Sequence, residues 1–183
     1  MTDIIDEIFE LFARFGSDRY GEDLSLESHM LQSAAQADSL KAPRHTVVAA
    51  LLHDVGHFLS PEGEPATGRG RELDHEAIGA AWLSRGFGEE VTAPIALHVN
   101  AKRYLCAVEP GYFDGLSQAS RLSLVVQGGV MTRAETATFA EEPAFVAALM
   151  LRRCDDTGKD SSGLTRSLAD YRDLMETCLR SAA

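Results

Sequence analysis

The sequence is short of cysteine, of long apolar runs and of basic residues. Its three cysteines, Cys106, Cys154 and Cys178, are odd in number and far apart, which argues against a disulfide framework and a cysteine zinc site. No apolar run approaches the roughly 20 residues of a membrane span. The first residues are acidic, whereas a secretory signal begins with basic ones. We therefore expect a cytoplasmic protein with buried thiols and no membrane partner.

Acidic residues outnumber basic ones, 28 against 17, and the formal net charge is -11. Such a surface repels a phosphate backbone, so we expect no nucleic-acid partner. A small anionic substrate is still compatible, because a few inward-facing cations override the surface charge locally. The length of 183 residues, with 45% hydrophobic and 25% charged, predicts one globular domain over residues 1–183.

Apolar residues recur at helical spacing along most of the chain, and no pair of segments alternates as two strands would. The fold class predicted is therefore all-α, a single-domain helical bundle. The patterns predict helices over residues 4–15, 25–40, 44–59, 74–87, 89–106, 116–129, 142–156 and 167–181.

Several residues mark where these helices begin and end. Gly16 is expected to end the first helix. Ser25 is expected to cap the second, with Ser28 as an alternative, and Pro43 is expected to start the third. A loop rich in glycine and proline follows the third helix at residues 61–70.

The stretch "AALLHDVGHFLS" places His53, Asp54 and His57 within five residues, straight after an apolar run. Such groups are costly to bury unless something compensates them. On a continuous helix, His57 lies one turn after His53 on nearly the same face, and Asp54 converges with His53 on an ion beside the helix. Imidazole with carboxylate is the ligand set of iron, manganese or zinc. A zincin is disfavoured, because its His-Glu-x-x-His motif needs a glutamate where Asp54 stands.

The order His29, His53-Asp54 and a late Asp155 resembles the H…HD…D motif of the HD-domain superfamily. Most members of that superfamily are metal-dependent phosphohydrolases on a helical bundle. His75 and His98 extend the pattern to six ligands, which is similar to the HD-domain mixed-valent diiron oxygenases of phosphonate catabolism (PhnZ/TmpB-like). The runs that carry this resemblance are "YGEDLSLESHMLQSA", "AALLHDVGHF", "DHEAIGAAWL", "HVNAKRYL", "VVQGGVMT" and "LRRCDDTGKD".

The resemblance implies two Fe ions, Fe(II) and Fe(III), with O2 as co-substrate. The implied metal ligands are His29, His53, Asp54 and Asp155 for one iron, and His75 and His98 for the other, with Asp54 bridging both. Beside His75, Glu76 and Asp74 are candidates to hold the other ring nitrogen.

The same resemblance implies that a phosphonate anion is held by His57, Lys102, Ser120 and Arg152. His57 and Lys102 would assist the diiron site in catalysis. The chemistry of these side chains suits the task, because arginine offers a planar fork, lysine a compact charge and serine a hydroxyl donor. Taken alone, Lys102 and Arg152 would be interpreted as solvated surface cations.

Glu22 corresponds to the acid that contacts the substrate's amino group. The family member that acts on the free amine has a lid tyrosine three residues before this acid, whereas this chain has Arg19 there, followed by Tyr20. Tyr20 and Glu22 would offer a trimethylammonium group an aromatic face and a carboxylate. Arg19 and Tyr20 are thus lid candidates, and the alternative of a simple loop at the helix entry stays open.

The function implied is oxidative cleavage of the C–P bond of an organophosphonate. The substrate is 1-hydroxy-2-(trimethylammonio)ethylphosphonate or 2-amino-1-hydroxyethylphosphonate, and the products are phosphate and glycine betaine or glycine. Two alternatives remain: an HD-type phosphohydrolase acting on a nucleotide or phosphate ester, and a metal-binding module without catalysis.

Overall fold

The computed structural model describes residues 3–18, 24–59, 74–158 and 166–180, and within these ranges the chain is helical and contains no β-strand. The predicted all-α fold class is confirmed. The elements are α1 (Ile4–Phe15), α2 (Leu26–Ser39), α3 (Arg44–Leu52), the 3₁₀ helix η1 (Val55–Leu59), α5 (His75–Leu83), α6 (Glu89–Val108), α7 (Tyr112–Gly115), α8 (Gln118–Val126), α9 (Arg133–Ala140), α10 (Phe145–Thr157), the 3₁₀ helix η2 (Leu168–Tyr171) and α11 (Arg172–Thr177).

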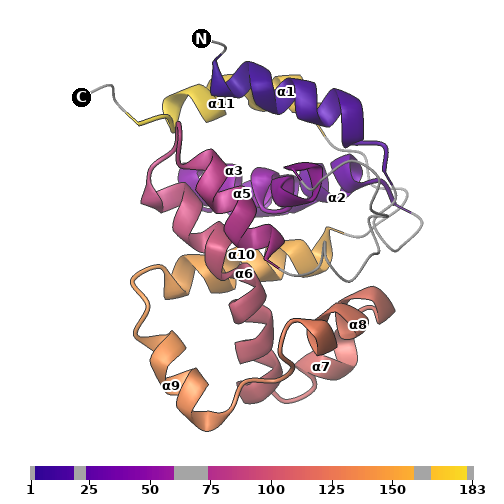
Figure 1. Ribbon diagram of the computed structural model, residues 1–183, viewed down its shortest axis with the longest axis vertical. Helices are drawn as coiled ribbons and strands as arrows, with labels where there is room; N and C mark the ends of the chain where they lie inside the picture. The colour runs from indigo at the N-terminus through magenta and orange to yellow at the C-terminus, as the bar shows by residue number, and fades with distance from the viewer. Residues whose placement is uncertain (1–2, 19–23, 60–73, 159–165, 181–183) are drawn as a thin grey trace.

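The helices are stacked from one end of the molecule to the other (Figure 1). Helices α1 and α11 lie at one end, α2, α3 and α5 lie below them, and α10 crosses α6 in the next layer. Helices α7, α8 and α9 form the opposite end. The larger hydrophobic core lies within the first three layers, and a smaller one joins α6, α9 and α10 around Ala101 and Phe139.

Local sequence explains the first two helices. Asp3 caps α1 by accepting a hydrogen bond from the Ile5 N–H at 3.2 Å, and the Gly16 N–H closes the helix on the Phe12 carbonyl. Ser25 caps α2 by accepting from the Ser28 N–H at 3.2 Å. The predicted ends at Gly16 and Ser25 are therefore confirmed.

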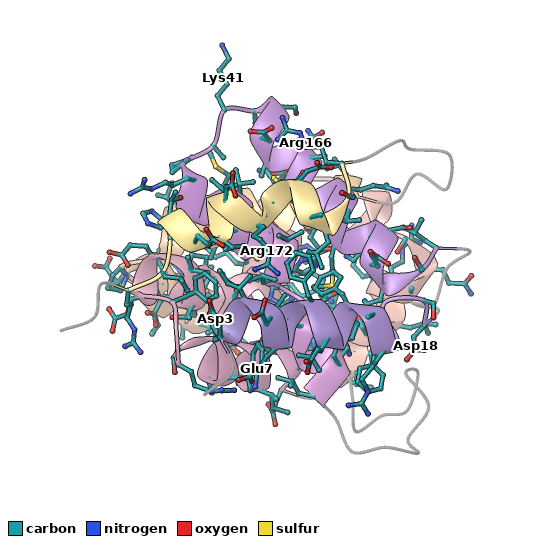
Figure 2. The ribbon with its side chains drawn as sticks, turned by 90° about the horizontal axis from the view of Figure 1, so that it is seen from above. Asp3, Glu7, Asp18, Lys41, Arg166 and Arg172 are labelled. Carbon is teal, nitrogen blue, oxygen red and sulfur yellow. The ribbon has the colours of Figure 1, made fainter. Side chains whose placement is uncertain are left out.

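The outer end of the bundle is held by α11 lying beside α1 (Figure 2). Arg172 of α11 forms an ion pair with Asp6 at 3.0 Å and lies 4.3 Å from the centre of the Phe9 ring. Underneath, Ile5 and Met175 are fully buried. Because the exposed ion pair contributes little by itself, burial of the apolar side chains supplies most of the stabilisation of this end.

The prediction of one helix over residues 44–59 is wrong. Helix α3 ends at Leu52, the chain turns at His53-Asp54, and η1 begins at Val55. The His57 N–H bonds to the Asp54 carbonyl at 2.9 Å, which is 3₁₀ spacing. His57 therefore does not follow His53 along one α-helical face.

The break in the helix brings η1 into close contact with α5. A Cβ atom on Gly56 would lie 1.9 Å from the His75 carbonyl oxygen, so only glycine allows this approach. Gly79 of α5 meets the same surface, since its Cβ would lie 3.0 Å from the Gly56 nitrogen. The glycine inside "HDVGH" thus sets the position of His75.

Other helix boundaries also differ from the prediction. Helices α7 and α9 were not predicted, although α9 begins with a capping box in which Thr132 and Glu135 bond each other's backbone N–H. The segment predicted as one helix over 167–181 is η2 followed by α11, which ends at Thr177. The predicted loop at 61–70 lies outside the described residues, and the single domain over 1–183 stays a prediction.

No helix among the described residues has the length and apolar character needed to cross a membrane.

Candidate metal centre and substrate site

Six of the predicted side chains meet in the middle of the bundle from five different places in the fold. They are His29 of α2, His53 and Asp54 in the turn after α3, His75 at the start of α5, His98 of α6 and Asp155 of α10. Each is at most 3% exposed. Since buried imidazoles and carboxylates need compensation, their convergence marks the chemical centre of the molecule.

The first group of nitrogens and oxygens lies between α2, α3 and α10. The Nε2 atoms of His29 and His53 are 3.2 Å apart. His29 Nε2 is 3.2 Å from Asp155 Oδ1, and His53 Nε2 is 3.3 Å from Asp54 Oδ2. We call these side chains the His29 side of the centre.

The second group lies between η1, α5 and α6, and we call it the His75 side. The Nε2 atoms of His75 and His98 are 3.3 Å apart. Asp54 Oδ1 is 3.4 Å from His75 Nε2 and 3.7 Å from His98 Nε2. Asp54 therefore turns one carboxylate oxygen toward each side, and both clusters of potential metal ligands contain it.

Backbone carbonyls define which ring nitrogens face the centre. The Nδ1 atoms of His29, His53 and His98 lie 2.8, 2.9 and 2.7 Å from the carbonyl oxygens of Gly158, Ala50 and Ile95. A carbonyl only accepts, so each Nδ1 carries the proton and donates it. In the neutral ring the Nε2 lone pair then points into the centre, where it meets another imidazole.

These lone pairs and the carboxylates fit bound metal ions. Facing lone pairs repel one another unless a cation lies between them, and imidazole with carboxylate suits iron, manganese or zinc. Within the described part of the chain, neither oxygen of the fully buried Asp54 accepts a hydrogen bond. Carbonyls that hold the other ring nitrogens are typical partners of metal-binding histidines. The residues present thus fit two metal ions with Asp54 between them.

The pKa values of the histidines differ between the two sides of the centre. Burial lowers the pKa of His53, but the carboxylates of Asp54 and Asp155 outweigh burial and raise it to about 9. Burial and the neighbouring imidazoles of His75 and His53 hold the pKa of His98 well below its usual value. Burial raises the pKa of Asp54, yet the imidazoles of His53, His75 and His57 outweigh it and leave the pKa well below the usual range.

His57 and Glu76 border the His75 side. The His57 ring stacks on the His75 ring with centroids 4.2 Å apart, and its Nε2 lies 3.9 Å from Asp54 Oδ1. Glu76 Oε2 is 3.4 Å from His75 Nδ1. Asp74 is exposed and has a left-handed backbone with φ of 68°. Of the two acids proposed to hold the other ring nitrogen of His75, Glu76 is therefore the one beside it.

Lys102 lies one turn after His98 on α6 and is only 3% exposed. Its Nζ donates to the Ser123 hydroxyl of α8 at 2.8 Å. Ser120 is buried one turn earlier on α8, where its N–H donates to the Ser117 hydroxyl at 3.2 Å. A buried cation of this kind attracts an anion more strongly than an exposed lysine does.

Arg152 of α10 is also buried, and three groups accept from it. Its Nη1 donates to Asp155 Oδ2 at 2.6 Å, its Nη2 to Asp156 Oδ1, and its Nε to the Tyr112 hydroxyl at 3.1 Å. The Tyr112 hydroxyl in turn donates to Asp156 Oδ2. Burial lowers the pKa of Arg152, but Asp155 and Asp156 outweigh it and raise the pKa well above the usual value.

Three residues that contact the predicted site were not predicted from the sequence: Tyr112, Ser123 and Asp156. Asp156 stands four residues after Arg152, the helical spacing of an ion pair, so the signal was present in "LRRCDDTGKD". Tyr112 contacts Arg152 across 40 residues of sequence, and no local pattern indicates such a pair. The predicted residues Arg19, Tyr20 and Glu22 lie outside the described residues.

The HD-domain family matches residues 26–118, a range that contains His29, the His53-Asp54 pair, His75 and His98. The chain belongs to the HD-domain family. This HD-domain protein is 42% identical over 176 residues to the hydroxymethylphosphonate dioxygenase of Gimesia maris, with 96% of this chain and 88% of the relative covered.

Two more relatives cover most of this HD-domain protein. It is 40% identical over 157 residues to the 1-hydroxy-2-(trimethylamino)ethylphosphonate dioxygenase (glycine-betaine-forming) of Leisingera caerulea, covering 85% of this chain and 80% of the relative. It is 34% identical over 174 residues to an uncharacterised protein of Acanthamoeba polyphaga mimivirus, covering 93% and 80%. The predicted membership of the HD-domain oxygenases of phosphonate catabolism is therefore confirmed.

Proposed function

We propose that this HD-domain enzyme is a diiron dioxygenase that uses O2 to cleave the C–P bond of a 1-hydroxylated organophosphonate. Its similarity over most of its length to two named phosphonate dioxygenases makes it an oxidoreductase. The observation that carries the proposal is that buried Asp54 lies between two imidazole pairs and turns one oxygen to each.

In this proposal His29, His53 and Asp155 would hold one iron, and His75 and His98 would hold the other, with Asp54 available to both. When bound, the irons would activate O2, which is the oxidant that takes electrons from the substrate. The protein contributes a buried set of lone pairs whose Nδ1 partners prevent the rings from turning.

The substrate anion is proposed to lie against Lys102 and Arg152, with His57 and Ser120 as additional donors. A phosphonate carries up to two negative charges, and buried cations attract them far more strongly than surface cations do. Arg152 already donates to the carboxylates of Asp155 and Asp156, which offset part of its charge. We therefore propose that Lys102, beside the Ser123 hydroxyl, shares the binding of the anion with Arg152.

The group attached to the hydroxylated carbon is a finer part of the proposal. Tyr20 and Glu22 favour a trimethylammonium group and hence glycine betaine as the product, with the free amine as the alternative. The relative from Gimesia maris is named for hydroxymethylphosphonate, which carries no nitrogen. A test must therefore compare all three substrates.

The experiment measures phosphate release by the iron-loaded enzyme with ascorbate, in air and without O2. The substrates are 1-hydroxy-2-(trimethylammonio)ethylphosphonate, (R)-2-amino-1-hydroxyethylphosphonate and hydroxymethylphosphonate. We expect release only in air, and fastest from the trimethylated compound. Lys102→Met should raise KM at least tenfold, whereas Lys41→Met, a change at an exposed lysine, should match the wild type.

Release of phosphate from these compounds without O2, or no release from any of them in air, would overturn the proposal. Hydrolysis of nucleotides or phosphate esters with Mn(II) would then indicate the phosphohydrolase alternative. Faster release from hydroxymethylphosphonate would keep the dioxygenase and reject the role given to Tyr20 and Glu22.

A further inference from the structure

We propose that Tyr112 and Asp156 are positioning residues that hold Arg152 against Asp155, and thereby direct one oxygen of Asp155 to the His29 side of the metal centre. The inference rests on the metal centre of the proposed function. It assigns a task to two residues that neither the sequence motif nor the ligand clusters include.

Tyr112, Asp156 and Arg152 form a closed ring of hydrogen bonds. Asp156 accepts from Arg152 through Oδ1 and from the Tyr112 hydroxyl through Oδ2. The Tyr112 oxygen also accepts from Arg152 Nε at 3.1 Å. Because two edges of the planar guanidinium are held by different groups, its plane and the direction of the third nitrogen are determined.

The third nitrogen transmits this orientation to the metal centre. Arg152 Nη1 donates to Asp155 Oδ2 at 2.6 Å, which leaves Asp155 Oδ1 facing His29 Nε2 at 3.2 Å. A carboxylate with one oxygen held by an arginine offers a metal the other oxygen only. The arrangement thus favours a single metal–oxygen bond from Asp155 over a bidentate one.

Among the residues that the structure describes, Tyr112 is the member of this ring that comes from outside helix α10. Arg152, Asp155 and Asp156 stand at spacings of three and four on α10, so the arginine alone can reach both acids. After α6, Gly111 adopts a left-handed φ of 81°, and α7 begins at Tyr112. Burial raises the pKa of the Tyr112 hydroxyl, so it stays a proton donor to Asp156.

The neighbouring pair Arg153 and Glu109 provides a natural contrast. Their side chains are 52% and 39% exposed, against 4% and 21% for Arg152 and Asp156. An exposed ion pair is screened by water and contributes little. The chain therefore offers a matched control in which the same kinds of groups meet one residue away without facing the centre.

The test measures metal binding without substrate, together with kinetics. Tyr112→Phe and Asp156→Asn are compared with Tyr104→Phe and with Glu109→Gln. Tyr104 of α6 packs against Phe139 of α9 and Phe145 of α10, so Tyr104→Phe removes a hydroxyl from an aromatic cluster. Fe(II) and Mn(II) affinities are titrated under nitrogen, and the electron paramagnetic resonance spectrum of the oxidised iron-loaded protein is recorded. The unfolding temperature of each metal-free variant shows whether it folds.

We expect Tyr112→Phe and Asp156→Asn to bind one of the two ions about tenfold more weakly and to give an altered spectrum. Each substitution removes a hydrogen bond that orients Arg152, which in turn holds the proposed ligand Asp155. The other ion and both controls should match the wild type. Should Asp156→Asn fail to fold, Tyr112→Phe, which loses one oxygen atom, decides the question. Normal affinity and spectrum in Tyr112→Phe, with or without a raised KM, would overturn the inference.

The same data separate this inference from the proposed function. A wild-type protein that binds two ions but releases no phosphate overturns the dioxygenase, while the metal affinities of the variants still decide the positioning role. A wild-type protein that binds no metal overturns both.

Discussion

The two sides of the centre have the same number of imidazoles but different charge. The His29 side contains Asp155 and one oxygen of Asp54, whereas the His75 side contains only the other oxygen of Asp54. The pKa values follow this difference, since that of His53 is raised to about 9 and that of His98 is held well below its usual value. A cation is therefore stabilised more on the His29 side, by Coulomb attraction in a buried setting.

Two clusters built from the same types of side chain thus differ in charge, and we expect the metal sites that they would form to differ as well. The additional carboxylate of the His29 side, that of Asp155, also accepts a hydrogen bond from Arg152, which holds it in place. We expect the ion on the His29 side to bind more tightly and the ion on the His75 side to leave first.

The largest effect is expected from Asp54→Asn, because this substitution removes the carboxylate charge that the two sides of the centre share. Metal content should fall to less than one ion per chain, and phosphate release should fall to background, since an amide offers no negative charge. The control is Asp38→Asn, at an exposed ion pair with Arg166. Two bound ions in Asp54→Asn, measured by elemental analysis, would contradict the shared role.

Two variants, each lacking one imidazole on one side, should show the difference in metal affinity between the sides. His98→Ala is expected to keep about one tightly bound ion, because the His29 side remains intact. His29→Ala should bind its remaining ion at least tenfold more weakly than His98→Ala does. Competitive titration with a chelator measures both affinities, and equal losses in the two variants would show that the sides are equivalent.

Gly56→Ala should damage the His75 side selectively. The added Cβ would lie 1.9 Å from the His75 carbonyl, so η1 and α5 must separate. We expect a loss of about 1–3 kcal/mol in the free energy of unfolding, as for other overpacked sites. Weaker binding of one ion, with the other retained, is the expected metal readout. Unchanged thermal unfolding and metal content would disprove the close approach.

The smallest effect is expected in the pH dependence of the unfolding temperature of the metal-free protein. Because the folded-state pKa of His53 is raised from 6.5 to about 9, its stabilisation is full below pH 6.5 and is lost as pH rises toward 9. The lowered pKa of His98 acts in the opposite sense, so stability also falls as pH drops below 6.5. The unfolding temperature without metal should therefore be highest near pH 6.5.

Two changes should remove the fall of the unfolding temperature between pH 6.5 and 9. The variant His53→Gln lacks the titrating imidazole. In the wild type, bound Zn(II), which cannot change its redox state, takes the place of the proton on His53. Differential scanning calorimetry from pH 5 to 9 measures all three profiles. An alkaline decline that persists unchanged in His53→Gln would assign it to another group.

Much of the local structure was predictable because local forces decide it. Apolar spacing predicts α1 and α2, and the capping groups at Asp3, Gly16 and Ser25 form bonds within a few residues of themselves. The helix over 44–59 failed for a non-local reason, since its break accompanies the contact of Gly56 with His75 on another element. A periodicity within one segment contains no information about that contact.

The helical class, the family and the histidines and aspartates of the centre follow from the sequence alone. The position of Asp54 between two imidazole pairs, the carbonyls that hold the Nδ1 atoms and the contact of Tyr112 with Arg152 follow only from the folded structure. The physical reason is that helix formation depends on neighbours a few residues apart. The charge and orientation of the centre depend instead on the packing of helices that are distant in sequence.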